Sequence, residues 1–497
     1  MENVPLQLEL RPVLPNIFGH ADYNEFRATL VKIDEILCIG DLENQIVDQA
    51  MAQWITDNNK DSEFCNSKAI SYQWKLLRYA LRCNIARHLT REGLRPFSVR
   101  LTDSTLFQWF TRINELSSRK AASKSSLFRY SHYFDNELVE SVFQQWQAET
   151  LSNADKSVAI GINKLVQFDE LFMDSTCVKA NIHFPVDWVL LRDGVRSLLL
   201  AIKTIRNQGL KHRMIAPAII MRQMNKLAIE MTHTRRRRDS KKQRKAILRS
   251  MKKLSQLVSK HGERYRDLLS ERWNQTTWTE KQANQVIGRI NNILNQLPVA
   301  LKQAHERIIG GRAVPSDEKI LSLYEPDAHV IVRGKAGAEV EFGNGLLLTE
   351  QTDGIIIDWE LFEDQPRSDS RLLKDTVTRI KKCYGPVSSA SADRAFSSKN
   401  NQCFLKENHV YDAICPKSPT LLRERLQESR FVELQLRRSQ TEGRIGIFKN
   451  VFLGRPLRSK GFLNKQLNIT WCVLTHNLWV IARMALADEQ IPLKKAA

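Results

Sequence analysis

The sequence has few cysteines and no long uninterrupted apolar stretch. Its eight cysteines are scattered, without a Cys-x-x-Cys pair or a short Cys/His cluster, which argues against a structural zinc site and against a disulfide scaffold. We therefore expect reduced thiols in a cytosolic compartment. The amino terminus lacks the basic and then apolar pattern of a secretory signal. His476, Asn477 and Arg483 interrupt the apolar residues 469–487, so this stretch is expected to be a buried helix rather than a membrane span.

Acidic residues are outnumbered by basic ones. The chain has 75 Lys and Arg against 55 Asp and Glu, a formal charge of +20. This excess indicates a polyanionic partner, with nucleic acid as the first candidate and an anionic membrane surface as the second. A Gly-x4-Gly-Lys-Ser/Thr phosphate loop is absent from the sequence, so ATP-dependent action is not indicated. The 497 residues are enough for two or three globular domains.

The first third of the chain has helical periodicity. From about residue 22 to residue 147, apolar residues return every three or four positions, which predicts a separate α-helical region. Within it, Thr102-Asp103-Ser104 and the basic stretch 118–124 are typical of helix starts. A helix-turn-helix unit that contacts DNA phosphates fits this pattern, and so does any basic helical bundle.

Around Val166 the period changes from three or four to two. Residues 178–184 alternate as in a half-buried strand, and 168–174 are expected to form its neighbour, joined by a tight turn at Ser175-Thr176. Helical periodicity returns from Trp188 to about Ile309. The simplest architecture for that stretch is a helix pair inserted into a sheet domain after the second strand.

The strongest charge run in the protein lies inside this helical stretch. Residues 235–253 contain eleven Lys or Arg and one acid, Asp239. A solvated helical face is the plain interpretation, but so many like charges repel one another unless an anion neutralises them. We therefore predict contacts to the DNA backbone from the first members of the run, which are Arg235, Arg236, Arg237, Arg238, Lys241 and Lys242.

Strand-like segments resume after Pro315. Four short segments punctuated by glycine, 329–333, 338–342, 346–350 and 354–361, predict an antiparallel meander. A helix over 370–383, a strand ending near Asp393, a second helix and a strand over 411–415 follow, with helices from Leu421 to the end. Strands followed by alternating helices and strands predict a mixed α/β sheet.

Two aspartates are expected at strand ends. Asp174 closes the first predicted strand, and Asp393 closes a strand of small residues just before a helix signal. Ligands bind at the carboxyl ends of strands in open α/β sheets, because side chains there project from the edge of a rigid layer. Either aspartate taken alone is explained as an ordinary helix cap.

A third acid strengthens the case. Gln435, Arg438, Glu442 and Lys449 are spaced by three, four and seven positions, which places them on one helical face. An exposed Arg438–Glu442 pair would contribute only ~0.3 kcal/mol. Gly443 and Gly446 lie in the same helix; because each costs about 1 kcal/mol there, they predict close approach of another backbone or a ligand.

Three converging carboxylates need a counter-cation, since like charges raise one another's pKa. Mg²⁺, or Mn²⁺ as its substitute, suits such oxygen ligands. Two ions ~4 Å apart can hold the attacking and leaving oxygens of a phosphodiester displacement.

These segments together resemble the DDE transposases of bacterial insertion sequences. Phe172–Asp187 is similar to that family's first-Asp segment, and Arg333–Gly343 to its Arg-Gly-Lys-Ala-Gly and Val-Glu-Phe-Gly signature. Ala392–Ser397 resembles the second-Asp box, and residues 438–449 fit the Tyr-x2-Arg-x3-Glu-x6-Lys box. Residues 474–483 are similar to the closing helix of relatives. Gln435 departs from the pattern, because the family has Tyr at that position.

The resemblance implies a fold and a domain organisation. It implies a ribonuclease-H-like catalytic domain over 161–487, with a large helical insertion at about 188–315. An α-helical DNA-binding domain, helix-turn-helix-like, would precede it over 1–160, and a tail over 488–497 would follow. The insertion accounts for the 219 positions between the first and second acids.

The resemblance also implies roles for residues. Asp174, Asp393 and Glu442 would be catalytic acids that bind two Mg²⁺ ions, and Arg438 and Lys449 would contact DNA phosphates near the transposon end. The expected protein is a cytoplasmic, nucleoid-associated bacterial transposase with no membrane partner. It would bind double-stranded DNA, both transposon ends and target, as a homodimer in the active complex. A catalytically inactive or domesticated DNA-binding protein and a nuclease without strand transfer remain the alternatives.

Overall fold

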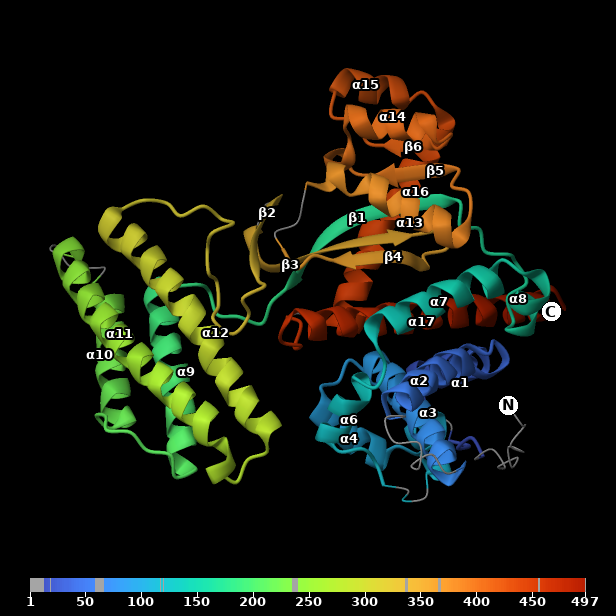
Figure 1. The fold of residues 1–497 in the computed structure, drawn as a ribbon. Helices are drawn as coiled ribbons and strands as arrows, with labels where there is room; N and C mark the ends of the chain where they lie inside the picture. The colour runs from blue at the N-terminus through green and yellow to red at the C-terminus, as the bar shows by residue number, and fades with distance from the viewer. Residues whose placement is uncertain are drawn as a thin grey trace. The chain divides into compact units, whose positions relative to one another are not determined.

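The structure is a computed structural model, and its elements are labelled in Figure 1. It describes residues 13–17, 19–58, 67–116, 118, 120–234, 240–335, 338–364, 368–454 and 456–496. The chain forms two compact units. The first comprises Met1–Thr176, Leu346–Leu361 and Arg367–Ala497, and the second comprises Cys177–Gly345 and Phe362–Pro366. The fold is rich in helix and contains one mixed six-stranded sheet, which confirms the predicted mixed α/β class.

The amino-terminal region of the first unit is helical, as its periodicity predicted. Its helices are α1 (Ala21–Ile39), α2 (Leu42–Asn58), α3 (Ser67–Leu89), α4 (Leu94–Asp103), α5 (Thr105–Thr111), α6 (Lys124–Ser131), α7 (Asn136–Leu151) and α8 (Ala154–Ala159). Both predicted helix starts are present. The Ser104 side chain caps α5 by accepting a hydrogen bond from the Phe107 N–H, and Ser123 caps α6 in the same way.

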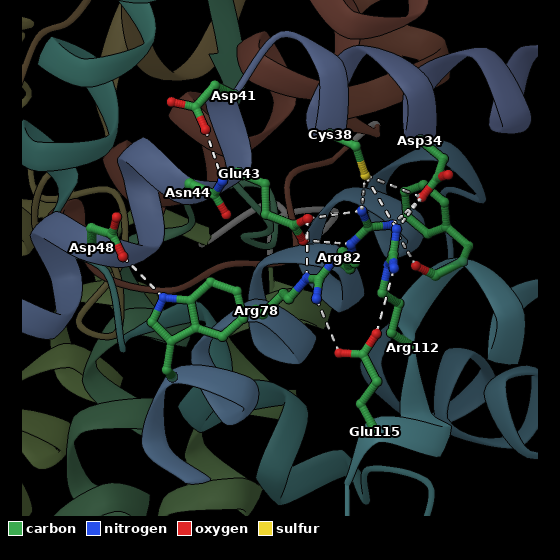
Figure 2. Close-up of polar contacts among 12 residues, drawn as sticks. Asp34, Cys38, Asp41, Glu43, Asn44, Asp48, Arg78, Arg82, Arg112 and Glu115 are labelled. Atoms are coloured by element: carbon green, nitrogen blue, oxygen red, sulfur yellow. Dashed lines mark hydrogen bonds and ion pairs between the residues drawn. The ribbon is translucent and has the colours of Figure 1, made fainter. Parts of the chain in front are cut away.

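A buried network of charges joins these helices (Figure 2). Arg82 of α3 is fully buried, and its Nη1 lies 2.6 Å from Asp34 Oδ1 of α1 while its Nε lies 2.5 Å from Glu43 Oε1 of α2. Arg112, just after α5, also reaches Asp34, and Arg78 reaches Glu43. Each buried charge has an opposite charge beside it, as buried ions require, so the network fixes how α1, α2 and α3 pack.

The long helix α17 (Phe462–Ala496) packs against α1, α3 and α7 within the first unit. Residues Phe462–Glu489 are long and apolar enough to cross a membrane, but 72% of the most apolar window is buried inside the protein. Trp471, Leu474 and Leu478 are fully buried. The prediction of a buried core helix is therefore confirmed.

The sheet has the strand order β2-β3-β1-β5-β6, with β4 paired to β3. Its strands are β1 (Glu170–Lys179), β2 (His329–Lys335), β3 (Ala338–Glu350), β4 (Ile356–Leu361), β5 (Ser389–Ala392) and β6 (Tyr411–Ile414). The antiparallel partners of β3 are β2 along its first half and β4 along its second half. The meander was correctly predicted, except that two of its expected strands are the single strand β3.

The predicted turn at Ser175-Thr176 is wrong. One continuous strand, β1, runs through both residues, and no Gly or Pro interrupts the stretch. Because Thr and Val are favourable in strands, the alternation simply continues. Strand β1 is parallel to β5, which in turn is parallel to β6.

Among its described residues, the second unit contains four long helices rather than the expected pair, and they follow β1 rather than a second strand. They are α9 (Asp187–Asn207), α10 (Pro217–Thr234), α11 (Ser240–Arg272) and α12 (Glu280–His305). They pack side by side in Figure 1 around a core that includes Leu198, Met224, Val258 and Leu297. The helical stretch itself was correctly predicted. Its helix number was not, because periodicity marks a buried face without marking each break.

The remaining elements of the first unit position Asp393 and Glu442. Helix α13 (Leu373–Tyr384) leads to β5, and α14 (Lys399–Glu407) leads to β6. Helix α15 (Pro419–Arg425) precedes α16 (Ser429–Ile447), which continues as a π-helical segment over Phe448–Leu453. Helix α16 packs against β5 and β6.

Candidate active site

Asp174 lies in the middle of β1, not at its end as predicted. The parallel register pairs Phe172 with Ser391, so two positions further along each strand Asp174 is level with Asp393. Strand β5 ends at Ala392. Asp174 is therefore placed where its neighbouring strand stops, which exposes it to a site at the carboxyl end of β5 although its own strand continues.

Asp393 follows directly after β5, as predicted. Its Oδ1 accepts a hydrogen bond of 2.8 Å from the Ala395 N–H and so caps the 3₁₀ turn Arg394–Phe396. The ordinary capping role considered from the sequence is thus present. A carboxylate has two oxygens and about four acceptor positions, so this cap leaves Asp393 capable of a second interaction.

Glu442 and Arg438 lie one turn apart on α16 and form an ion pair with 3.5 Å between Arg438 Nη1 and Glu442 Oε1. Glu442 is 59% exposed, whereas Arg438 is 16% exposed. Arg438 Nε also donates to Gln435 Oε1 at 3.0 Å, and Gln435 Nε2 donates to the Ala413 carbonyl at 2.5 Å. Gln435 thereby ties the helix to β6 and orients Arg438, a role that needs no aromatic ring.

The electrostatics of Asp174 bring the three acids together. Burial, together with the charges of Asp393 and Glu442, raises the pKa of Asp174 to about 6. The Ser175 N–H and the Arg438 guanidinium act in the opposite direction on this pKa. Desolvation is the largest cause of the raised pKa, and repulsion by the two neighbouring acids comes next. The fold thus brings Asp393 and Glu442 close enough to Asp174 to affect its ionisation.

The donor set is only partly arranged for a cation. Within the described part of the chain, there is no group of three or more His, Cys, Asp and Glu positioned to hold a metal ion. The pKa of Asp174 shows repulsion among carboxylates that a divalent cation would relieve. Glu442, however, is paired with Arg438. The three oxygen donors therefore suit Mg²⁺ in chemistry, and Glu442 has to change partner to join them.

Lys449 is buried against β1. The α-helix ends at Ile447, and Lys449 lies in the following π-helical segment, where its Nζ donates to Thr176 Oγ1 at 2.8 Å. Thr176 is two residues from Asp174 and so shares its face of the strand. From the sequence, Thr176 was expected in a turn and was given no functional role.

Gly443 and Gly446 do not face another backbone. A Cβ atom added at either position would meet nothing within 4 Å. The expectation of close protein packing at these glycines is therefore wrong, because they line open space. A ligand in that space would still account for the two glycines.

The structure describes only some of the basic residues predicted to contact DNA between positions 235 and 242. Arg235, Arg236, Arg237 and Arg238 lie outside the described residues. Lys241 and Lys242 are exposed in the first turn of α11, and the buried residues of this helix, which include Leu248, Met251 and Val258, begin two turns further along it. The two lysines are thus available to a polyanion.

Arg437 and Glu350 were missed from the sequence. Their side chains form a buried ion pair of 2.9 Å between Arg437 Nη1 and Glu350 Oε1. Arg437 is adjacent to the predicted Arg438, and a helical wheel alone does not distinguish which of two neighbouring arginines contacts the sheet.

No family model, curated protein or solved structure matches this chain.

Proposed function

We propose that the protein is a transposase that binds the terminal inverted repeats of its own insertion sequence, cleaves DNA at the element's ends and joins those ends to target DNA. The observation that carries this proposal is the electrostatic convergence of Asp174, Asp393 and Glu442 from two strands and a helix. A raised carboxyl pKa produced by burial and neighbouring acids is typical of functional sites.

We further propose that the sheet and its flanking helices form a ribonuclease-H-like catalytic domain. Two features support this. An antiparallel set of strands precedes two parallel strands that are reached through helices, and both aspartates come from adjacent parallel strands. In this proposal the four helices α9–α12 are the insertion, and α1–α8 form the DNA-binding region.

Asp174, Asp393 and Glu442 are the residues that would hold two Mg²⁺ ions, with Mn²⁺ as a substitute. Bound there, the ions would supply Lewis acidity to the phosphodiester displacement. Within the protein itself, burial keeps water from screening Asp174. Arg438 supplies a positive charge that lowers the pKa of Asp174, and it can move between Glu442 and a DNA phosphate because Arg binds both groups by the same planar donors.

DNA binding is assigned to the basic residues. Lys241 and Lys242 on α11 would contact backbone phosphates, together with Arg235, Arg236, Arg237 and Arg238. The formal charge of +20 supports a double-stranded DNA partner, since phosphate contacts dominate the affinity of such complexes. We propose a homodimer as the active complex and the bacterial cytoplasm, at the nucleoid, as its location.

The test uses the DNA that flanks the reading frame. Inverted repeats found there are made into an end-labelled duplex and incubated with the full-length protein and Mg²⁺. We expect cleavage by the wild type, none by Asp174→Asn, and equal DNA binding by both. Absence of repeats and of cleavage would reject the transposase, and loss of binding in Asp174→Asn would reject the role of Asp174 as a metal ligand.

A further inference from the structure

All three nitrogens of the Arg437 guanidinium donate hydrogen bonds to the end of β3 and the turn that follows it. Its Nε donates to the Thr352 carbonyl at 2.7 Å, its Nη2 to the Gln351 carbonyl at 2.9 Å, and its Nη1 to Glu350 Oε1 at 2.9 Å. The guanidinium also lies over the ring of Phe172, with 4.5 Å between Cζ and the ring centroid. One side chain of α16 thus contacts both β1 and the turn that follows β3.

Glu350 is the acceptor at the centre of these contacts. It is the last residue of β3 and is 4% exposed. Besides Arg437, its Oε1 accepts a hydrogen bond of 2.7 Å from Thr441 Oγ1, and Arg444 Nη1 lies 3.8 Å away. We call Glu350, Arg437 and Thr441 the Glu350 clamp. A buried carboxylate with charged and neutral donors is a strong anchor, because leaving any of these groups unpaired is costly.

The clamp fixes the rotation of α16 about its own axis. Arg437, Thr441 and Arg444 are spaced by four and three residues and so share one face. Arg438 and Glu442 each follow a clamp residue by one position, which places them about 100° around the helix. With the clamp face held on the sheet, this second face, which also carries Gln435, meets the end of β5. Gln435 Nε2 lies 3.4 Å from the carbonyl oxygen of Ala392, the residue before Asp393, and the register of the two strands puts Asp174 level with Asp393.

The same contacts fix the distance to β1. Phe172, under the Arg437 guanidinium, is two residues before Asp174 and therefore on the same face of the strand. A shift of α16 that moved Glu442 away from Asp174 would have to break the Arg437–Phe172 contact and the three hydrogen bonds together.

We infer that the Glu350 clamp positions Glu442 for cation binding beside Asp174, and that Arg437 is a positioning residue for the chemistry at this site. The inference rests on the proposed function. Residues that orient metal ligands typically change metal affinity 10–100-fold when they are altered. Lys cannot replace Arg437, because its single ammonium cannot meet three acceptors in one plane and stack on a ring.

The experiment compares Arg437→Lys with Arg379→Lys in the full-length protein. Arg379 of α13 is the matched control, because it forms a two-pronged pair with Asp358 at 2.9 and 2.8 Å and its other acidic partner is Glu360, not one of the three acids. The measurements are terminal-repeat DNA affinity and single-turnover cleavage against Mg²⁺ and Mn²⁺ concentration. For Arg437→Lys we expect unchanged DNA affinity, about a tenfold higher Mg²⁺ concentration at half-maximal rate, and partial rescue by Mn²⁺. Arg379→Lys keeps the wild-type Mg²⁺ dependence.

Equal Mg²⁺ dependence in the wild type and Arg437→Lys, or the same change in both lysine variants, overturns the inference while the proposed function stands. A wild type that cleaves nothing rejects the proposed function, and the inference with it. Should circular dichroism show that Arg437→Lys is unfolded, the milder pair Thr441→Val and Thr441→Ser decides. A higher Mg²⁺ requirement in Thr441→Val but not in Thr441→Ser supports the clamp, and equal behaviour of the two overturns it.

Discussion

Thr176 accepts a hydrogen bond from the buried ammonium of Lys449 at 2.8 Å, two residues along β1 from Asp174. This contact joins the segment after α16 to the strand that carries the first acid. Lys449 is 6% exposed, so in this conformation its charge faces the protein interior.

The Thr176 hydroxyl should therefore contribute to stability. We expect Thr176→Val to lower the free energy of unfolding by about 1 kcal/mol, since it removes a charge-assisted acceptor without leaving a cavity. Thr176→Ser, which keeps the hydroxyl, is the control and should remain close to the wild type. Urea unfolding monitored by circular dichroism measures both. A loss in Thr176→Ser as large as that in Thr176→Val would show that keeping the hydroxyl does not preserve stability, and would reject this role of the hydrogen bond.

Asp174 should cost the protein stability at neutral pH without metal. Its folded pKa, raised to about 6 from an ordinary 3.8, means that between these values the native state holds more protons than the unfolded state. Stability therefore falls as pH rises from about 4 to about 6. Asp174→Asn lacks this loss, and we expect it to be more stable by ~3 kcal/mol at pH 7.5 in chelator, with the difference vanishing below about pH 4.

Thermal unfolding across this pH range tests the prediction. Mg²⁺ at about 100 times its dissociation constant should stabilise the wild type by ~2.7 kcal/mol and have no effect on Asp174→Asn. A difference between the two proteins that stays constant with pH would remove the electrostatic explanation.

Arg82 should be essential for the amino-terminal helices. Removing one partner of a buried ion network leaves uncompensated charges, so Arg82→Met should cost ~3–5 kcal/mol. Burial tends to raise the pKa of Glu43, but Arg82 and Arg78 lower it overall. The stability that Glu43 provides is present above its unfolded pKa and is lost as pH falls through the lower folded value. Guanidinium unfolding at pH 7 gives the cost, and Arg100→Met, at a half-exposed pair with Glu92, is the control that should lose less than about 1 kcal/mol.

Lys241 and Lys242 should contribute to DNA affinity through counterion release. If each neutralises one phosphate, replacing both by Ala lowers the slope of log affinity against log salt by about 1.8. Fluorescence anisotropy with a labelled duplex at several salt concentrations measures this. An unchanged slope would exclude α11 from the DNA interface, and Lys281→Ala with Lys302→Ala on α12 is the charge-matched comparison.

Much of the fold could be predicted from periodicity, because a buried face repeats at the period of its element. The strand at Ser389–Ala392, the helix that carries Glu442 and the buried terminal helix α17 all follow from local patterns. The turn predicted at Ser175-Thr176 failed, because polar residues in a strand resemble a turn when the partner strand is unknown. The number of helices in α9–α12 was wrong for a related reason, since connections that are short beside helices of 18 to 33 residues barely disturb the apolar repeat.

The candidate site was predictable only in part. The three acids were recognised by residue type and order, and the fold places Asp393 and Glu442 where they affect the pKa of Asp174. The contact between Lys449 and Thr176 and the Glu350 clamp depend on pairings between residues 87 to 273 positions apart. Such pairings are set by tertiary packing, which a local pattern does not contain.

Strand transfer distinguishes a transposase from a nuclease, because only a transposase joins the cleaved ends to target DNA. Pre-cleaved, end-labelled terminal-repeat DNA is incubated with supercoiled plasmid, Mg²⁺ and the full-length protein or its variants Asp174→Asn, Asp393→Asn and Glu442→Gln. We predict labelled plasmid with the wild type and none with any of the three variants, although all four proteins bind the DNA. Unlabelled plasmid with the wild type, or joined product that persists in any one variant, would contradict a transposase site built from these three carboxylates.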